Sequence, residues 1–455
     1  MIPCPVAHAP ADRAAVVVDG VVFSYGQLHA MACAHTDSLR ARGLSGLRVA
    51  VRAPNSVELI ALHVAAARTE TLLIPLNLRL TDTEQDAQAA RLRAVATIDA
   101  SIHEPTTTTT TKTSRFTMSL AAETVILTSG TTGSAKGARL PLSCFSASAQ
   151  ASSSVLRATQ DDVWLLCLPL FHVGALAMMW RSLFLGSTVR LLPASDVDGI
   201  AFLLAAGAIT QASFVSATLE AVLKAMPRSA SRLTSVLVGG GPVAPELLTR
   251  AQSRGVPALW TWGLTEAASQ VATARTAGRA CGHALPGNRL RVVDDDRREV
   301  RVGDIGEIEV RGPTIFRGYL DDDDATAAAL PGDGFLRTRD LGFVDDDGAL
   351  SVVARRSDLI VSGGENLYPA MIERVLQRCR AVVDVAVVPV ADEQWGQRPA
   401  ALLVLRPGGD VAEVRAFAAS ELSRLSRPDR FVVVDALPKN ALGKLERHRL
   451  AALIP

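Results

Sequence analysis

The feature that most restricts the fold is a regular alternation of short apolar runs and longer amphipathic segments between about residues 45 and 265. Runs such as RVAVRA, TLLIPLN and TVILTSG have the length and composition of buried strands, and segments such as VELIALHVAAAR have a helical period. Strands that alternate with helices form a mostly parallel sheet covered on both faces. We therefore predict an α/β fold with layered, mostly parallel sheets and helices.

Two changes of pattern divide the rest of the chain. From about residue 285 to 355, short alternating strands with acidic turns predict a β-rich subdomain. Residues 356–455 then follow the order helix, strand, strand, helix, strand, helix, which is typical of a compact α+β domain. We predict a large N-terminal domain over residues 1–355 and a small C-terminal domain over residues 356–455. The threonine-rich segment 104–114 has low complexity and predicts an exposed linker.

Charge and composition favour a small-molecule substrate. The 455 residues include 47 Lys and Arg and 46 Asp and Glu, so the net charge of +1 lacks the basic excess of a nucleic-acid binder. Six scattered cysteines and a proline-containing N-terminus without a signal-peptide pattern indicate a cytoplasmic protein. The apolar stretch 163–180 contains Pro169, His172 and Gly174, so it favours a buried strand and helix over a membrane span. A monomer and a homo-oligomer both remain open.

The strongest chemical signal is a loop rich in glycine and hydroxyl residues that directly follows the apolar run 124–127. Its backbone N–H and hydroxyl groups can turn toward phosphate oxygens, and a nearby lysine can offset their charge. The chain has only five lysines, so a lysine at this place is notable. The loop therefore predicts a nucleoside triphosphate site. Its residues are Thr128, Ser129, Gly130, Thr131, Thr132, Gly133 and Lys136.

With this loop, the chain resembles the adenylate-forming (acyl-CoA synthetase) superfamily over nearly its whole length. The superfamily's other motifs follow in order: Trp262-Gly-Leu-Thr265-Glu266, Gly303-Asp-Ile-Gly-Glu307, Thr338-Arg-Asp340, Arg355, Ser362-Gly-Gly-Glu-Asn366 and Pro438-Lys-Asn-Ala-Leu-Gly-Lys444. The resemblance implies an ATP-dependent acid:CoA ligase that forms an acyl-adenylate and then a thioester. Its substrates would be a small carboxylic acid, ATP and coenzyme A, with Mg²⁺ as the metal.

The same resemblance implies roles around the nucleotide. Glu266 would contact Mg²⁺, Thr265 a phosphate and Trp262 the adenine, at a place where the family usually has tyrosine. Asp340 would accept the ribose hydroxyls, and Arg355 would donate to the ribose or a phosphate. Three alternatives stay open: Glu266 as a solvated surface carboxylate, Trp262 as a core aromatic, and Asp340 and Arg355 as members of structural ion pairs.

The C-terminal motifs imply a second group of roles. Lys444 matches the catalytic lysine that bridges the substrate carboxylate and the α-phosphate during adenylation. Ser357 stands at the family's hinge position, where Asp or Lys is usual. Rotation of a mobile C-terminal domain there would bring Ser362, Gly363 and Gly364 to the thioester-forming step, and the two glycines suit a loop that lets the pantetheine arm pass close to backbone.

Residues 169–181 are similar to the o-succinylbenzoate:CoA ligase family of menaquinone synthesis. In that family an arginine nine places after the histidine contacts a substrate carboxylate, and Arg181 stands nine places after His172. His172, Arg181, Ser213 and Gly241 are therefore the expected acid-site residues, with His172 also expected to act in catalysis. Arg181 as a snorkelling surface arginine and His172 as a core histidine remain alternatives. Ser216 replaces a proline common in relatives, so another aromatic or medium-chain acid also remains open.

Two other interpretations have some support. Gly239-Gly-Gly241-Pro-Val-Ala244 formally fits the glycine pattern of a dinucleotide fold, but Pro242 and the lack of an acid near residue 260 argue against it. We instead expect Gly240 and Gly241 to form a wall of the adenine and acyl pocket. A degenerate ligase kept as a binding module is disfavoured because the lysines and the acid of the motifs are all present.

Overall fold

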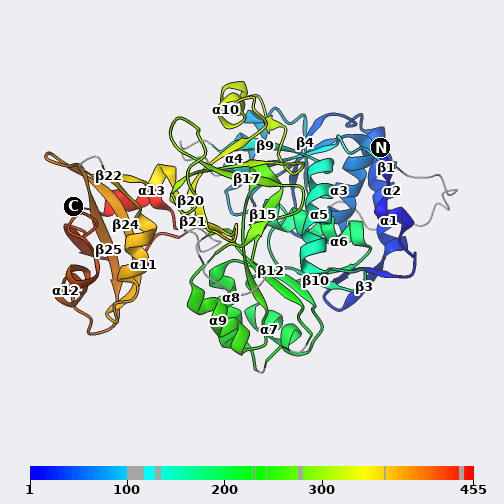
Figure 1. Ribbon diagram of the computed structural model, residues 1–455. Coiled ribbons are helices and arrows are strands. Elements are labelled where there is room, and N and C mark those ends of the chain that lie inside the picture. Colours follow the sequence, from blue (N-terminus) through cyan, green and yellow to red (C-terminus); the bar gives the residue numbers. More distant parts are fainter. Residues whose placement is uncertain are drawn as a thin grey trace. The chain divides into compact units, whose positions relative to one another are not determined.

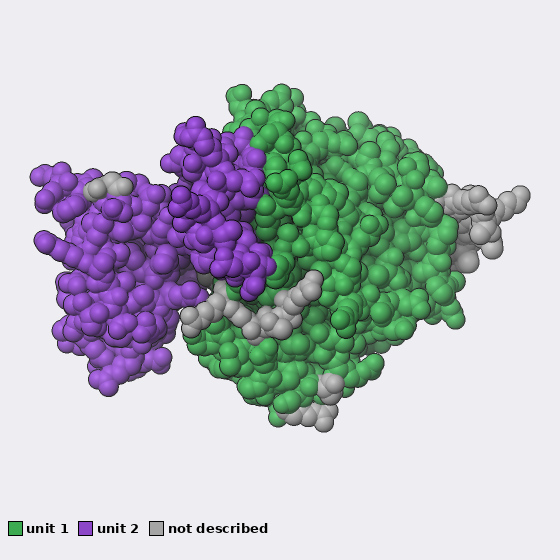
Figure 2. Space-filling model, viewed as in Figure 1, with its two compact units in different colours: residues 1–290, 310–337 green, residues 291–309, 338–455 purple. Residues whose placement is uncertain are grey.

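The computed structural model describes residues 1–99, 117–128, 135–227, 229–230, 232–241, 243–274, 280–362, 365–439 and 445–454. The predicted linker 104–114 lies outside these residues. The chain forms two compact units, one of residues 1–290 and 310–337 and one of residues 291–309 and 338–455 (Figure 2).

The first unit contains a six-stranded sheet in the order β19-β9-β8-β5-β4-β6. β4, β5, β6 and β8 are parallel, and the antiparallel strands β9 and β19 continue the sheet beyond β8. The strands are β4 (Arg48–Arg52), β5 (Leu72–Pro75), β6 (Ala96–Asp99), β8 (Glu123–Thr128), β9 (Lys136–Pro141) and β19 (Gly318–Tyr319).

A nine-stranded sheet has the order β16-β15-β14-β13-β12-β10-β11-β2-β3. Its central strands are parallel, whereas β3, β15 and β16 run antiparallel to their neighbours. The strands are β2 (Ala14–Val18), β3 (Val21–Ser24), β10 (Val163–Leu166), β11 (Thr188–Leu191), β12 (Gln211–Phe214), β13 (Ser235–Val238), β14 (Ala258–Leu264), β15 (Ser269–Thr273) and β16 (His283–Ala284). β1 (Ile2–Pro3) and β7 (Thr117–Met118) form a separate pair.

The helices of this unit pack on the two sheets, and α5 contacts β9 of one sheet and β15 of the other (Figure 1). The predicted layered, mostly parallel α/β fold is therefore confirmed. The helices are α1 (Pro5–His8), α2 (Tyr25–Ala41), α3 (Val57–Thr69), α4 (Asp82–Arg91), α5 (Leu142–Leu156), α6 (Val173–Leu185), α7 (Val197–Ala205), α8 (Ser216–Ala225), α9 (Pro245–Ser253), α10 (Asp323–Ala329) and the 3₁₀ turn η1 (Thr265–Ala267).

Local sequence explains these elements well. The N-cap side chain of Ser24 accepts the Gln27 N–H, and the Gln27 side chain accepts in return, which is the capping box that starts α2. All four residues of β13 are buried, as expected for a strand in the middle of a parallel sheet. The apolar stretch 163–180 forms β10 and most of α6, as predicted. Within the described parts of the chain, no helix is long and apolar enough to span a bilayer.

The second unit contains a four-stranded and a five-stranded sheet. The first consists mainly of residues from this unit, with the strands β17 (Arg289–Val293), β18 (Gly306–Arg311), β20 (Leu336–Val344) and β21 (Leu350–Arg355). The second has β22 (Ile360–Ser362), β23 (Glu365–Leu367), β24 (Val382–Asp392), β25 (Gly396–Leu405) and β26 (Arg430–Val433), with helices α11 (Pro369–Leu376), α12 (Val411–Glu421) and α13 (Arg447–Leu450). The turns η2 (Arg356–Asp358) and η3 (Ala451–Leu453) complete the unit.

From α11 onward the order of elements matches the predicted α+β arrangement, but two strands that were not predicted, β22 and β23, precede it. Successive side chains of a strand point to opposite faces of its sheet. Accordingly, Val387 of β24 packs in one apolar cluster with Ile372 of α11, and Val388 packs in another with Leu450 of α13. The structure groups most of the β-rich strands with the C-terminal residues. The functional boundary between residues 355 and 356 stays a prediction.

His63 on α3 allows a test of this packing. Its side chain is buried, and neither ring nitrogen has a hydrogen-bond partner within the described part of the chain. Burial lowers the pKa of the imidazole from 6.5 to about 4. The unfolded chain therefore binds the proton more readily, so the stability that neutral His63 contributes is complete above pH 6.5 and is lost as the pH falls toward 4.

We expect wild-type protein to lose about 2 kcal/mol more unfolding free energy than His63→Leu between pH 7.5 and pH 5.0. Urea unfolding at both pH values measures this difference. His283→Leu, which replaces an exposed histidine, is measured in parallel as the matched substitution. An equal loss in His63→Leu and wild type would contradict the prediction.

Candidate functional site

The predicted phosphate loop joins two antiparallel strands of the first unit. β8 and β9 pair from Glu123 opposite Pro141 to Thr128 opposite Lys136, so Thr128 and Lys136 face each other at the loop's two ends. The Thr128 hydroxyl donates to the Lys136 carbonyl at 3.3 Å. Five predicted loop residues lie outside the described parts of the chain, and their role stays a prediction: Ser129, Gly130, Thr131, Thr132 and Gly133.

A buried carboxylate stabilises this strand pair. The Glu123 side chain is 5% exposed, and its Oε2 accepts from Nε of Arg139 at 2.8 Å. Its Oε1 lies 2.7 Å from Nη1 of Arg317, directly before β19. A carboxylate removed from water is stable only when it is paired, so Glu123 connects β8, β9 and the chain segment that enters β19.

Lys136 and Glu266 both contact Tyr319. The ammonium nitrogen of Lys136 lies 5.3 Å from the centroid of the Tyr319 ring, and the Tyr319 hydroxyl donates to Oε1 of Glu266 at 2.8 Å. Lys136 Nζ also lies 3.9 Å from Oδ2 of Asp322. The structure thus brings together the lysine expected at a phosphate and the acid expected at Mg²⁺. One carboxylate combined with phosphate oxygens is an ordinary ligand set for Mg²⁺, so Glu266 fits that role.

Glu266 is partly buried and its carboxylate accepts a hydrogen bond from Tyr319, so it is not a freely solvated side chain, and its contact with Mg²⁺ stays a prediction. Glu266 and Thr265 lie in η1, directly after β14. Trp262 is 7% exposed on β14, so it is a core aromatic in this structure, and its contact with adenine stays a prediction.

The Trp262–Glu266 motif contains a glycine that the backbone requires. The β14–β15 pairing shifts register between Trp262 and Gly263, and a Cβ on Gly263 would lie 1.6 Å from the Ser269 carbonyl oxygen. Ala268 and Ser269 have positive φ of 49° and 88°, which marks a tight reversal directly after Glu266. Only glycine allows the returning strand to pass this close.

Several predicted residues follow the carboxyl ends of neighbouring parallel strands. β10, β12, β13 and β14 are adjacent in the sheet, and they are followed by, or end in, His172, Ser213, Gly240 with Gly241, and Trp262. Ligands of α/β sheets bind at this edge. Gly240 has a φ of +80°, whereas a Cβ on Gly241 would meet nothing within 4 Å. The arrangement agrees with Gly241 and Ser213 lining a substrate site, and that role stays a prediction.

His172 is the N-cap residue of α6, and its ring lies 4.5 Å from that of Phe171. Burial, followed by the positive charge of Arg79, lowers the pKa of His172 to about 4. The imidazole is therefore neutral at physiological pH. The side chain of Asn55 supports the segment before it, because its amide donates to the Leu168 carbonyl at 2.8 Å.

Arg181 is 2% exposed, so the alternative of a snorkelling surface arginine is wrong. Its Nη2 donates to Oε1 of Gln270 at 2.6 Å, and its guanidinium lies 5.0 Å from the Trp164 ring. Burial lowers its pKa to about 9, so the group keeps its charge at neutral pH. Nine residues along α6 separate Arg181 from His172, which is about 13 Å along the helix axis. The structure does not bring these two side chains into contact.

Asp340 and Arg355 lie in the second unit and pair with each other. They stand opposite one another on β20 and β21, and Nε of Arg355 lies 2.7 Å from Oδ1 of Asp340. The alternative of an ion pair is therefore what the structure shows for these two residues. Their contacts with ribose or phosphate stay predictions.

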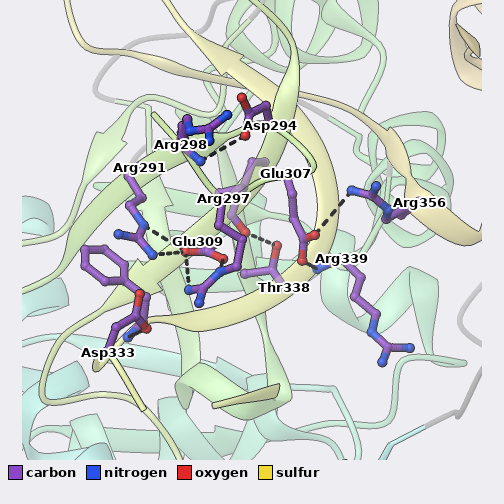
Figure 3. A network of polar contacts seen from close by, with 12 residues as sticks. Arg291, Asp294, Arg297, Arg298, Glu307, Glu309, Asp333, Thr338, Arg339 and Arg356 are labelled. Atoms are coloured by element: carbon purple, nitrogen blue, oxygen red, sulfur yellow. Dashed lines mark hydrogen bonds and ion pairs between the residues drawn. The ribbon is translucent and has the colours of Figure 1, made fainter. Parts of the chain in front are cut away.

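Two glutamates on β18 anchor the four-stranded sheet (Figure 3). The Glu309 side chain is fully buried and accepts from Nε of Arg291 and Nε of Arg297, each at 2.8 Å. Glu307 belongs to the motif that begins at Gly303, and its carboxylate lies 3.4 Å from Nη1 of Arg356. The motif glutamate therefore holds the residue directly before the predicted hinge.

The residues on either side of the predicted hinge residue Ser357 form ion pairs with different parts of the second unit. Arg356 is bound to Glu307, and the carboxylate of Asp358 lies 3.1 Å from Nε of Arg447 on α13. Ser357 itself donates to Asp358 at 3.2 Å within η2. Ser362 is buried at the end of β22, and its role in thioester formation stays a prediction. Gly363, Gly364 and Lys444 lie outside the described residues.

Several residues of the site were not identified from the sequence. Tyr319 stands in no motif that we used, although it is one of only three tyrosines in the chain. Arg79 near His172 and Gln270 beside Arg181 give no local signal, because each meets its partner only after distant segments pack.

Comparison with known proteins decides the family. A family model described as AMP-binding enzyme matches residues 5–320, and its C-terminal domain model matches residues 371–444. The chain belongs to the AMP-binding enzyme family. The predicted membership of the adenylate-forming superfamily is thereby confirmed.

Curated and solved relatives within the AMP-binding enzyme family agree with one another. A 2-succinylbenzoate–CoA ligase from Bacillus cereus is 34% identical, over 97% of this chain and 96% of its own. The o-succinylbenzoate CoA synthetase from Bacillus subtilis, solved with ATP and magnesium ion, has a TM-score of 0.91 and 29% identity, covering 99% of each chain. The same enzyme solved with its acyl-adenylate has a TM-score of 0.88 and 29% identity, covering 98% of each chain.

Gly263 and Gly241 provide a matched pair of predictions for this AMP-binding enzyme. Gly263→Ala would place its Cβ against the Ser269 carbonyl oxygen, so we expect it to lower the unfolding free energy by about 3 kcal/mol. Gly241→Ala meets open space and should change stability by less than about 0.5 kcal/mol while raising the KM for ATP or the acid. Chemical unfolding and steady-state kinetics measure both effects. Equal stability losses in the two variants would contradict the assignment.

Proposed function

We propose that this protein is an ATP-dependent acid:CoA ligase that converts 2-succinylbenzoate to 2-succinylbenzoyl-CoA, with AMP and diphosphate as by-products. The contacts of Tyr319 with Lys136 and Glu266 support the ATP part of the proposal. The full-length likeness to relatives named for this acid supports the substrate. We expect the enzyme to act in the cytoplasm.

The reaction has two steps that balance separately. In the first, a carboxylate oxygen attacks the α-phosphorus of ATP, the bond to the β-phosphate oxygen breaks, and diphosphate leaves. In the second, the thiol of coenzyme A attacks the acyl carbon, AMP leaves as a phosphate monoester, and the thiol proton is released. The first step brings two anions together, so the site must offset negative charge.

The residues of the first unit suit that requirement. Lys136 is positioned at the end of the phosphate loop, and Glu266 is a hard oxygen ligand for Mg²⁺. Bound Mg²⁺ supplies positive charge to the phosphates. His172 is neutral and partly buried beside Phe171, so it can close the acid site without adding a charge. We assign to Lys444 the role of offsetting the negative charge while the substrate carboxylate meets the α-phosphate.

The second acid group of the substrate needs its own partner. A 2-succinylbenzoate carries two carboxylates, and only one reacts. Arg181 is a buried cation on the helix that follows the acid-site motif, and a guanidinium matches the geometry of a carboxylate. We assign it to the unreacted carboxylate, which it would reach in the substrate-bound enzyme.

We also propose that residues 1–355 and 356–455 act as two functional domains that move about Ser357. The proposal is supported by the ion pairs of the two residues beside Ser357. Arg356 pairs with Glu307 of the β-rich sheet, and Asp358 pairs with Arg447 of the C-terminal helix α13. Rotation between these anchors would exchange the adenylating and thioester-forming arrangements.

The direct test is release of diphosphate from ATP with 2-succinylbenzoate, benzoate or a medium-chain fatty acid, with and without coenzyme A. We expect acid-dependent release with 2-succinylbenzoate and a thioester only when coenzyme A is present. A preference for benzoate or a fatty acid would favour the alternative of another aromatic or medium-chain acid. No acid-dependent release would contradict the proposal.

Lys444→Ala should severely slow acyl-adenylate formation and leave thioester formation from supplied acyl-adenylate intact. The reason is that the lysine offsets charge only while the carboxylate and phosphate meet. Single-turnover measurements of each half-reaction make the comparison. Gly364→Leu is the reciprocal control and should slow only the coenzyme A step, because its side chain would enter the path of the thiol. Equal losses of both half-reactions would reject the two-step assignment.

Arg181→Ala should reduce kcat/KM for 2-succinylbenzoate by at least about 100-fold more than for benzoate, because removing one partner of a buried charged pair costs about 3–5 kcal/mol. Steady-state kinetics with both acids measure the difference. Gln270→Leu removes the hydrogen-bond partner of Arg181 but keeps the cation, so it should affect both acids alike. An equal loss for both acids in Arg181→Ala would make the arginine purely structural.

A further inference from the structure

Tyr319 contacts the two groups that the proposed chemistry needs most. Its hydroxyl donates to Oε1 of Glu266 at 2.8 Å, and Lys136 Nζ lies 5.3 Å from the centroid of its ring. A hydrogen bond to an ionised carboxylate is about twice as strong as a neutral one. An ammonium group over an aromatic face is attracted by the ring's quadrupole. A single side chain therefore restrains both a carboxylate and a cation.

The surrounding backbone holds the ring in place. β19 pairs antiparallel with β9, with Tyr319 opposite Ala138, two residues after Lys136. The backbone N–H of Tyr319 donates to the Thr326 hydroxyl at 2.8 Å. Gly318 has a φ of +131°, and a Cβ there would lie 2.6 Å from the Thr326 methyl group, so the approach to Tyr319 needs glycine.

The Glu266 side is held independently. The backbone N–H of Phe316 donates to the Glu266 carbonyl at 2.8 Å, and the Phe316 ring meets the Tyr319 ring edge-on at 4.9 Å between centroids. Phe316 therefore binds the backbone of Glu266 and packs against the Tyr319 ring, while the Tyr319 hydroxyl binds the Glu266 carboxylate. Because the phenol uses Oε1, it also determines the direction in which Oε2 points.

We propose that Tyr319 is a positioning residue that aligns Glu266 for Mg²⁺ and Lys136 for the phosphates of ATP during adenylate formation. This inference rests on the proposed function. Packing alone would be satisfied by phenylalanine, which this chain uses 12 times against three tyrosines. The hydroxyl bonded to Glu266 is what phenylalanine cannot supply. Tyr319 acts through these two side chains and is not itself assigned a contact with substrate.

The first test separates the hydroxyl from the ring. Tyr319→Phe keeps the ring beside Lys136 and removes the bond to Glu266. We expect the Mg²⁺ concentration for half-maximal diphosphate release to rise about tenfold, with thioester formation from supplied acyl-adenylate unchanged. Tyr319→Leu also removes the aromatic face, so we expect a further rise of about threefold in the KM for ATP. Tyr368→Phe, at a partly buried tyrosine of the second unit, is the matched control and should leave the Mg²⁺ dependence unchanged.

A double-mutant cycle makes the test independent of any general loss of stability. In a Glu266→Gln background, Tyr319→Phe should have little further effect on the Mg²⁺ dependence, because the charged acceptor is already gone. Full additivity of the two changes would overturn the inference, as would a wild-type Mg²⁺ dependence in Tyr319→Phe. Equal slowing of both half-reactions by Tyr319→Phe would also overturn it and leave a structural role. Absence of acid-dependent diphosphate release in the wild type would instead reject the proposed function.

Discussion

The buried carboxylate of Glu123 is the interaction on which the candidate nucleotide site depends. Its two oxygens are bound by Arg139 on β9 and Arg317 before β19, so the paired strands β8 and β9 and a segment distant in sequence meet at one charge. The side chain is 5% exposed, so removal of either partner would strongly destabilise the fold around it. Lys136 begins β9 and Tyr319 ends β19, so Glu123 joins the segments that carry both residues.

The chain uses its two basic residue types differently. Arginine supplies the buried pairs, as at Glu309, where Arg291 and Arg297 each donate to one carboxylate. A planar guanidinium with several fixed donors suits such sites, whereas an ammonium group is a compact charge on a flexible stem. Lys136 lies over the Tyr319 ring and 3.9 Å from Oδ2 of Asp322, so its ammonium group is held near the end of the predicted phosphate loop without a close carboxylate partner.

In the second unit several motif residues form ion pairs within the protein itself. Asp340 pairs with Arg355, and Glu307 holds Arg356 next to the predicted hinge. A ligand that uses Asp340 must therefore share it with Arg355. These ion pairs hold Asp340 and Arg355, which are expected to bind ribose, and Arg356, which precedes the predicted hinge.

The sequence by itself determined the α/β class, the order of the elements and the family, because apolar period, glycine loops and ordered motifs are local properties of the chain. It also located Lys136 and Glu266, because each stands in a local sequence motif. It did not identify Tyr319, and it left open whether Glu266 and Arg181 were surface residues. Those questions depend on contacts between segments as distant as β9 and β19, or α6 and β15, which form only when the sheets and helices pack. Only the tertiary structure decided them, because burial and ion pairing are properties of the folded chain as a whole.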